Sequence, residues 1–217
     1  MFQTINIGKI KTSKVELRDI SKAWIVLSLA FAFLLFPRFY GSGLSLLNGF
    51  SFEKLFSSQF LNLFMISLFT AGLGFLLHEL GHKFVAQRYG CVAEFRVWDQ
   101  FLYLALGLAV VIGMIFAAPG AVMISGMITR RENGIVSAVG PAINYILGLL
   151  FLGLLFILPS GNLIWWTGFS INMWLGLFNL IPFGNLDGYK VFQWNKVVWV
   201  GMVAIGVFFV FFYGKMI

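Results

Sequence analysis

The sequence predicts an all-α polytopic membrane protein with about five to six transmembrane helices and one re-entrant element. Three observations lead to this fold class. Of the 217 residues, 60% are hydrophobic and only 11% are charged, and the mean hydropathy is +0.92. Long uncharged runs recur along the chain, and most Lys and Arg residues lie in the short segments between them. A soluble domain needs more polar surface than this, so we expect lipid to surround most of the chain.

Five uncharged runs are long enough to predict membrane helices, at about Ala23–Phe36, Leu55–Leu77, Ile135–Leu158, Leu163–Pro182 and Val197–Gly214. The first run is short and needs Phe39 and Tyr40 to extend it. A cleavable signal peptide is the alternative there, but Pro37 and Arg38 follow the run where a signal peptide would have small residues. We expect one membrane domain over residues 1–217, with core helices at about 55–90, 135–158 and 163–190 and flanking helices at about 22–40 and 196–214.

A sixth uncharged run, Phe101–Ile128, is too long for one membrane helix and too short for two. If the N-terminus is cytoplasmic and this run does not cross, 12 of the 15 Lys and Arg residues lie on the cytoplasmic side. If the run crosses, Arg130, Arg131, Lys190 and Lys196 move to the opposite side. The positive-inside rule therefore predicts a multi-pass protein with a cytoplasmic N-terminus. It also predicts a re-entrant element between the metal-motif helix and the next core helix, which turns at Ala118-Pro119-Gly120.

The net charge of +7 does not indicate a nucleic-acid partner, because the cations lie between apolar runs where they set membrane orientation. The expected partners are the lipid bilayer and a membrane-protein substrate. A single cysteine, Cys91, excludes an intrachain disulfide.

The two histidines of the chain lie in the sequence His78-Glu-Leu-Gly-His82. Residues four apart lie on one face of a helix, so both imidazoles can bind one metal ion. Glu79 lies beside that face, where a carboxylate can act as a general base towards water. Interfacial histidines can also serve only as polar anchors at the lipid headgroups. However, burying a Glu and two His at the membrane end of an uncharged run is costly without partners, so the motif predicts one Zn²⁺ per chain.

A catalytic zinc site needs one further protein ligand and an open position for water. Of the eight carboxylates, Glu16 and Asp19 are assigned to the basic N-terminal segment, Glu53 to a loop and Glu132 to an ion pair after Arg130 and Arg131. Glu94, Asp99 and Asp187 remain, with Cys91 as a thiolate alternative. Asp187 is the best candidate, because Pro182 ends the preceding helix and Gly184 and Gly188 let the backbone turn back. Asp99 is the competing ligand.

Three blocks together resemble the site-2 protease family of intramembrane zinc metalloproteases. They are His78-Glu-Leu-Gly-His82, then Gly140-Pro-Ala-Ile-Asn144, then Asn179-Leu-Ile-Pro182 with Leu186-Asp187-Gly188. The blocks occur in the family's order on three predicted core helices. The chain departs from the family at Tyr189, where a second glycine is common, and in its long apolar Phe101–Ile128 run. We expect no appended regulatory domain.

The resemblance implies that His78, His82 and Asp187 hold zinc and that Glu79 is the general base. It also implies that Asn144, Asn179 and Pro182 bind substrate, and that Phe101–Ile128 supplies a hairpin-like substrate platform. The implied reaction is hydrolysis of a peptide bond in or near a transmembrane segment, as in regulated intramembrane proteolysis. Hydrogen bonding between helices is an equally good interpretation of Asn144 and Asn179.

Two other functions are compatible with metal ligands in a helical bundle. A membrane metal-binding or transport protein lines a path through the bilayer with polar groups, whereas every candidate ligand here is expected at one membrane face. A catalytically silent relative would act as a binding partner, but Glu79 is intact. The enzyme is therefore the favoured interpretation.

Overall fold

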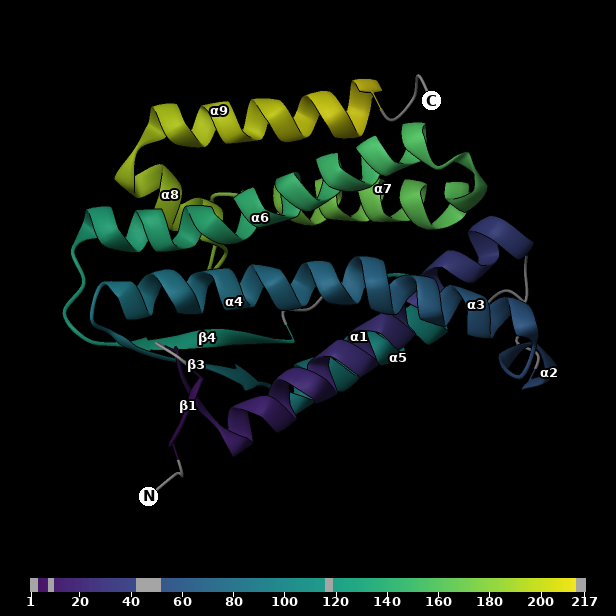
Figure 1. Ribbon diagram of the computed structural model, residues 1–217, viewed down its shortest axis with the longest axis horizontal. Coiled ribbons are helices and arrows are strands. Elements are labelled where there is room, and N and C mark those ends of the chain that lie inside the picture. Colours follow the sequence, from purple (N-terminus) through teal and green to yellow (C-terminus); the bar gives the residue numbers. More distant parts are fainter. Residues whose placement is uncertain (1–3, 8–9, 42–51, 116–118, 214–217) are drawn as a thin grey trace. The chain divides into compact units, whose positions relative to one another are not determined.

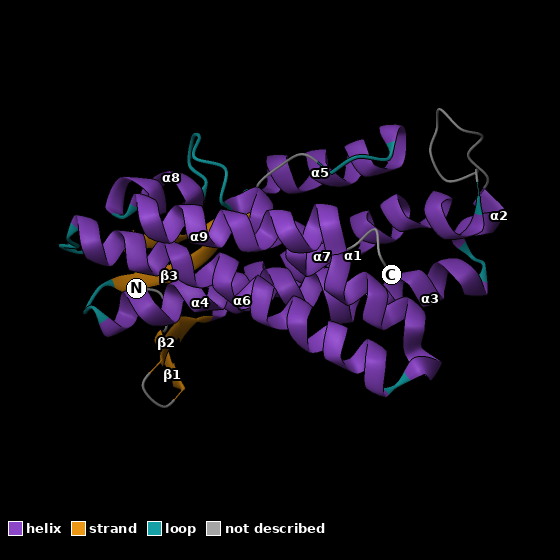
Figure 2. Ribbon diagram, turned by 90° about the horizontal axis from the view of Figure 1, so that it is seen from above, coloured by secondary structure: helices purple, strands orange, loops and turns teal. Residues whose placement is uncertain are grey.

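The computed structural model describes residues 4–7, 10–41, 52–115 and 119–213, and most of them are helical (Figures 1 and 2). Three helical segments are long and apolar enough to cross a membrane. They are α1 (Lys14–Tyr40), α6 (Arg130–Ile157), and the continuous run of α3 (Ser58–Ser67), the π-helix η2 (Leu68–Gly72) and α4 (Leu73–Arg88). These helices fit a membrane protein, as the composition predicts.

The remaining helices are shorter. They are α2 (Phe52–Leu55), α5 (Asp99–Ile112), the 3₁₀ turn η3 (Pro159–Gly161), α7 (Asn162–Asn179), α8 (Asp187–Trp194), α9 (Lys196–Val207) and the π-helix η4 (Phe208–Phe212). The expected helices at 163–182 and 197–214 correspond to α7 and to α9 with η4, and Gly214 lies outside the described residues. α7 contains three Asn and three Trp residues and is not among the three candidate spans of the described residues.

Four short strands depart from the all-α prediction. β1 (Thr4–Ile7) pairs with β2 (Ile10–Ser13), and β3 (Val92–Val97) pairs with β4 (Gly120–Ser125). In β3, Ala93 and Phe95 are buried while Val92 is exposed, which is the period of two that a strand requires. The run Phe101–Ile128 therefore holds most of α5 and the whole of β4. Ala118, in the expected turn, lies outside the described residues.

The chain divides into two compact units. The first contains Met1–Ile5, Lys11–Leu73 and Phe95–Ala121. Within it, α1 packs against α3, η2 and α5. Glu16 and Asp19, which the sequence assigned to the basic N-terminal segment, are both buried in α1. The Glu16 carboxylate accepts hydrogen bonds from the Thr12 hydroxyl at 2.7 Å and from the Phe95 backbone N–H at 2.8 Å.

The second unit contains Asn6–Ile10, Gly74–Glu94 and Val122–Ile217. α6 and α7 lie side by side, α8 packs on α6, and α9 packs on α7 and α8 (Figure 1). One buried core cluster of this unit consists of Tyr145, Leu152, Phe169, Met173 and Leu180. α4 also approaches α6 closely, because a Cβ on Gly81 would lie 2.3 Å from the Ile143 side chain. This unit contains all the residues of the candidate site.

Candidate metal centre

One cluster among the described His, Cys, Asp and Glu residues could hold a metal ion. It consists of His78, His82 and Asp187, whose ligand atoms lie within 4.8 Å of one another. All three side chains are buried. The Nε2 atoms of His78 and His82 lie 3.2 and 3.1 Å from the same Oδ2 atom of Asp187. Three donors from two distant parts of the sequence therefore face one point.

α4 presents the two histidines on one face because they are one helical turn apart. Their ring centroids are 4.7 Å apart and the ring planes meet at 85°. This edge-to-face arrangement lets both Nε2 atoms face Asp187 while both rings remain on the same helix. The four-residue spacing is thus sufficient to build two of the three donor positions.

The turn after α7 brings Asp187 to the histidines. α7 ends at Asn179, and Gly184 has a φ of 62°, a left-handed conformation that favours glycine. Asp187 is the first residue of α8. A Cβ on Gly188 would lie 2.1 Å from the Leu180 carbonyl oxygen, so glycine is needed for α8 to begin this close to the end of α7.

The surroundings of Asp187 favour its ionised form. Burial by itself would raise the pKa of the Asp187 carboxyl, but the charge of His82 and hydrogen bonds from both imidazoles outweigh that effect. The pKa therefore lies below its usual value. The carboxylate is the form that can ligate a metal ion.

Each imidazole is oriented through its second nitrogen. The Nδ1 atom of His78 lies 2.6 Å from the Asn144 side-chain oxygen, and that of His82 lies 2.8 Å from the Val136 carbonyl oxygen. Both oxygens can only accept, so both Nδ1 atoms carry the proton and donate it. Nε2 is therefore the nitrogen of each ring that can give up its proton and bind a metal ion through its lone pair.

Gly140 of α6 provides space beside the two imidazoles. A Cβ at this position would lie 2.5 Å from the His82 Nε2 atom and 2.6 Å from the His78 Nε2 atom. No real side chain tolerates such contacts. The glycine therefore leaves open the region into which both ligand atoms point.

The donor set fits zinc. In a tetrahedral site with bonds of about 2.0 Å, neighbouring ligand atoms lie about 3.3 Å apart, close to the two His–Asp separations here. Two imidazoles and one carboxylate are also the protein ligands of many catalytic zinc sites, which keep a fourth position open. The residues present therefore match both the size and the chemistry of a zinc centre.

Glu79 is next to His78 in α4 and is only partly buried. Its carboxyl lies within hydrogen-bonding reach of the Val122 backbone in β4. Glu79 is outside the three-residue cluster. The structure thus leaves its carboxylate available for proton transfer next to the candidate ligands.

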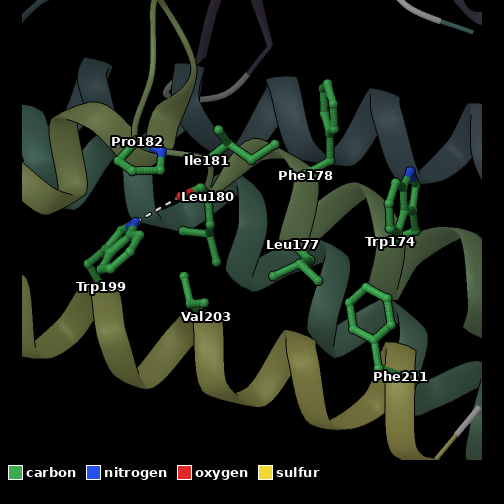
Figure 3. A pocket seen from close by; sticks show the side chains of 9 residues that line it. All are labelled: Trp174, Leu177, Phe178, Leu180, Ile181, Pro182, Trp199, Val203 and Phe211. Atoms are coloured by element: carbon green, nitrogen blue, oxygen red, sulfur yellow. Dashed lines mark hydrogen bonds between the residues drawn. The ribbon is translucent and has the colours of Figure 1, made fainter.

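The three residues that the resemblance assigned to substrate have different surroundings. Asn144 is fully buried and hydrogen-bonds to His78. Asn179 donates to the Leu175 carbonyl oxygen in its own helix at 2.9 Å. Pro182 lines an apolar pocket of about 290 Å³ between α7 and α9, where Trp199 donates to the Leu180 carbonyl oxygen (Figure 3).

The competing ligands Asp99, Glu94 and Cys91 do not belong to the cluster among the described residues. The Asp99 carboxylate pairs instead with Lys22 at 2.5 Å. Sequence reasoning missed Gly140 and Asn172 as site residues. Asn172 could have been noticed as a polar residue inside an uncharged run, because buried amides in apolar helices usually bond to another helix.

The chain is similar to several curated proteins. "Putative zinc metalloprotease MJ0611" of Methanocaldococcus jannaschii is 43% identical over 149 residues, which cover 66% of this chain and 78% of the relative. "Putative zinc metalloprotease Rip2" of Mycolicibacterium smegmatis is 33% identical over 135 residues, covering 54% of this chain and 52% of the relative. "Zinc metalloprotease MJ0392" of Methanocaldococcus jannaschii is 29% identical over 154 residues, covering 70% and 37%.

The chain thus spans most of the first relative, about half of the second and about a third of the third. No family model matches the chain. No solved structure matches it either. All three relatives carry the name of a zinc metalloprotease, which agrees with the donor set of the buried cluster.

Proposed function

The chain belongs to the site-2 protease family of zinc metalloproteases, and we propose that it is an endopeptidase that cleaves other membrane proteins in or near their transmembrane segments. Zinc is its cofactor. The observation that carries the proposal is the convergence of His78, His82 and Asp187 within 4.8 Å in a chain with three membrane-length apolar helices. We assign these three residues as the zinc ligands.

Bound zinc supplies Lewis-acid chemistry, because it activates water and polarises a carbonyl group. His78 and His82 would hold the ion through their Nε2 atoms, because Asn144 and the Val136 carbonyl fix the orientation of the two rings. Glu79 accepts a proton from the attacking water and delivers it to the leaving amine, which is the role of a general base and then a general acid. Burial of the cluster limits access of bulk water.

The substrate segment must be extended at the site, because the carbonyl groups of a helix are already hydrogen-bonded. β4 supports this part of the proposal. It pairs with β3 in a two-stranded sheet, so its other edge has backbone groups that an extended segment can pair with, and its Val122 faces Glu79. The apolar pocket beside Pro182 has the size and chemistry to take an apolar substrate side chain (Figure 3).

We place the site near the cytoplasmic face of a multi-pass protein with a cytoplasmic N-terminus. The length of α5 supports a re-entrant Phe101–Ile128 element. Its 14 residues extend about 21 Å, less than the roughly 30 Å of a hydrocarbon core. The partners of the chain are then the bilayer and a membrane-protein substrate, and regulated intramembrane proteolysis is the process it serves.

The test is Glu79→Gln, assayed in purified protein with a membrane-segment peptide as substrate. Gln keeps the shape of Glu but cannot take a proton, so hydrolysis should fall by about 10²–10⁴-fold while bound zinc persists. Glu53→Gln is the matched control, because Glu53 is exposed in α2. Activity of Glu79→Gln within a few-fold of wild type would rule out the mechanism.

A further inference from the structure

We infer that Asn172 of α7 is a positioning residue that fixes the orientation of His78 by acting through Asn144. This inference rests on the proposed role of His78 as a zinc ligand. Both asparagines are fully buried. α4 carries Gly74 beside the Asn172 amide, and a Cβ at Gly74 would lie 2.2 Å from the Asn172 side-chain oxygen.

A series of hydrogen bonds joins α4, α6 and α7. The Asn172 amide nitrogen donates to the Gly168 carbonyl oxygen at 2.9 Å. The Asn144 amide nitrogen donates to the Asn172 side-chain oxygen at 3.1 Å and to the Gly74 carbonyl oxygen at 3.2 Å. The Asn144 oxygen then accepts from the His78 Nδ1–H at 2.6 Å.

The donor and acceptor roles in this series of hydrogen bonds follow from the Gly168 and Gly74 backbone carbonyl groups. The Gly168 carbonyl can only accept, so the Asn172 nitrogen must face it and the Asn172 oxygen must face Asn144. That oxygen, together with the Gly74 carbonyl, holds the Asn144 nitrogen and turns the Asn144 oxygen towards His78. A proton is therefore held on His78 Nδ1, which leaves Nε2, the atom that faces Asp187, as the one that can bind a metal ion.

Loss of Asn172 would weaken the preference of the Asn144 amide for one orientation. Only the Gly74 carbonyl would then distinguish the two ends of the Asn144 amide. A rotated Asn144 would present its NH₂ group to His78 and would favour the tautomer with the proton on Nε2, which cannot ligate through that atom. If Asn172 only filled space between the helices, its loss would not change the tautomer of His78 alone.

His82 supplies an internal control. Its Nδ1–H donates to the Val136 backbone carbonyl, so its orientation does not depend on either asparagine. A general loosening of the bundle would affect both histidines. A defect in the asparagine chain should affect His78 and leave His82 unchanged.

The first experiment is a double-mutant cycle on zinc affinity, measured by chelator competition in purified protein. Loss of a side chain that hydrogen-bonds to a metal ligand typically lowers metal affinity by about 10–100-fold. We therefore expect such a loss of zinc affinity for Asn144→Ala, and a smaller, several-fold loss for Asn172→Ala. Because Asn172 acts through Asn144, the double variant should match Asn144→Ala. Losses that simply multiply would overturn the inference, and so would unchanged zinc affinity in Asn172→Ala.

The matched control for zinc affinity is Asn179→Ala. Asn179 lies on the same helix, and its amide makes the same bond to the carbonyl four residues earlier. It should keep wild-type zinc affinity. If Asn172→Ala does not fold, Asn172→Ser replaces it, because Ser keeps a polar group that is too short to reach Asn144.

The second experiment uses ¹⁵N-histidine labelling, which reports on only two side chains because the chain has two histidines. In Asn172→Ala, the ring nitrogens of His78 should shift or exchange between tautomers while those of His82 stay as in the wild type. Equal changes at both rings, or no change at His78, would overturn the inference. Failure of the proposed function would look different, because His78→Ala would then bind zinc as tightly as the wild type.

Discussion

Each side chain of the clustered triad depends on a neighbour that is not itself a candidate ligand. His78 depends on Asn144, His82 on the Val136 carbonyl, and Asp187 on the glycine that follows it. A buried imidazole or carboxylate without such partners would be costly to desolvate. Substitutions at the residue scale should therefore separate ligands from the groups that position them.

Removal of a ligand should remove the metal. We expect His78→Ala and Asp187→Ala to lose bound zinc, because each takes one of three protein donors. Asp99→Ala should keep one zinc per chain, because Asp99 pairs with Lys22. Metal analysis of the purified variants measures this directly. Full zinc occupancy in both His78→Ala and Asp187→Ala would show that the ligand set is wrong.

The space that Gly140 leaves beside the two imidazoles can be tested by substitution. Gly140→Ala places a methyl group against both imidazoles, so zinc affinity should fall by at least tenfold, as for other changes beside a metal site. Gly153→Ala is the control on the same helix, because a Cβ there meets nothing within 4 Å. It should leave zinc affinity unchanged. Equal zinc affinity of the two variants would mean that the ligands do not need this space.

The residue-scale site could be predicted where one helix or one turn defines it. The four-residue spacing brings His78 and His82 together, and the Pro182 to Gly188 segment indicates a tight turn before Asp187. The role of Asn172 could not be predicted. It depends on which faces of α4, α6 and α7 meet, and a sequence of apolar residues on all sides of a helix does not specify those faces.

At the scale of elements, a buried carboxylate in α1 makes a contact that the sequence did not predict. Glu16 accepts from the Phe95 backbone N–H, so this hydrogen bond joins α1 to the middle of β3. The burial of Glu16 could not be predicted, because the sequence gives no sign that β3 lies beside it. Glu132, which was expected to pair with the preceding arginines, also caps α6. It accepts from the Thr129 backbone N–H, and Thr129 caps in return.

We therefore expect Glu16→Ala to destabilise the protein by about 1–3 kcal/mol, the cost of leaving a buried donor unsatisfied. Glu53→Ala should change stability little, because Glu53 is exposed. Thermal unfolding in detergent compares the two variants. If Glu16→Ala unfolds at the same temperature as Glu53→Ala, the bond to Phe95 contributes nothing to stability.

The helices were predicted more completely than the strands, and for a physical reason. An uncharged run of about 20 residues can satisfy its backbone in lipid only as a helix or within a closed barrel, so it specifies helical structure strongly. β3 has six residues and begins just after α4, and its pairing with β4 depends on a partner more than 20 residues away. Such pairing leaves only a weak local signal.

At the scale of the whole molecule, the metal cluster constrains the topology. The His82 Nε2 atom lies 3.1 Å from the Asp187 Oδ2 atom, whereas opposite membrane faces are separated by roughly 30 Å of hydrocarbon. Both motifs must therefore lie at the same membrane depth. The chain between them must cross an even number of times, and α6 and α7 can provide one crossing each way. If α6 and α7 each cross once, we expect Phe101–Ile128 to return to the side from which it entered.

This topology predicts the outcome of cysteine labelling. Single cysteines at Asp99 and Asn133, which flank the Phe101–Ile128 run, are introduced into a chain without Cys91. Both should react with a membrane-impermeant reagent from the cytoplasmic side only, since a run that enters and returns leaves its two ends on one face. Cysteines at Lys54 and Arg88, which flank the candidate span Ser58–Arg88, are the controls and should react from opposite sides. Labelling of positions 99 and 133 from opposite sides would mean an odd number of crossings, which would exclude both the re-entrant element and a zinc site shared by His82 and Asp187.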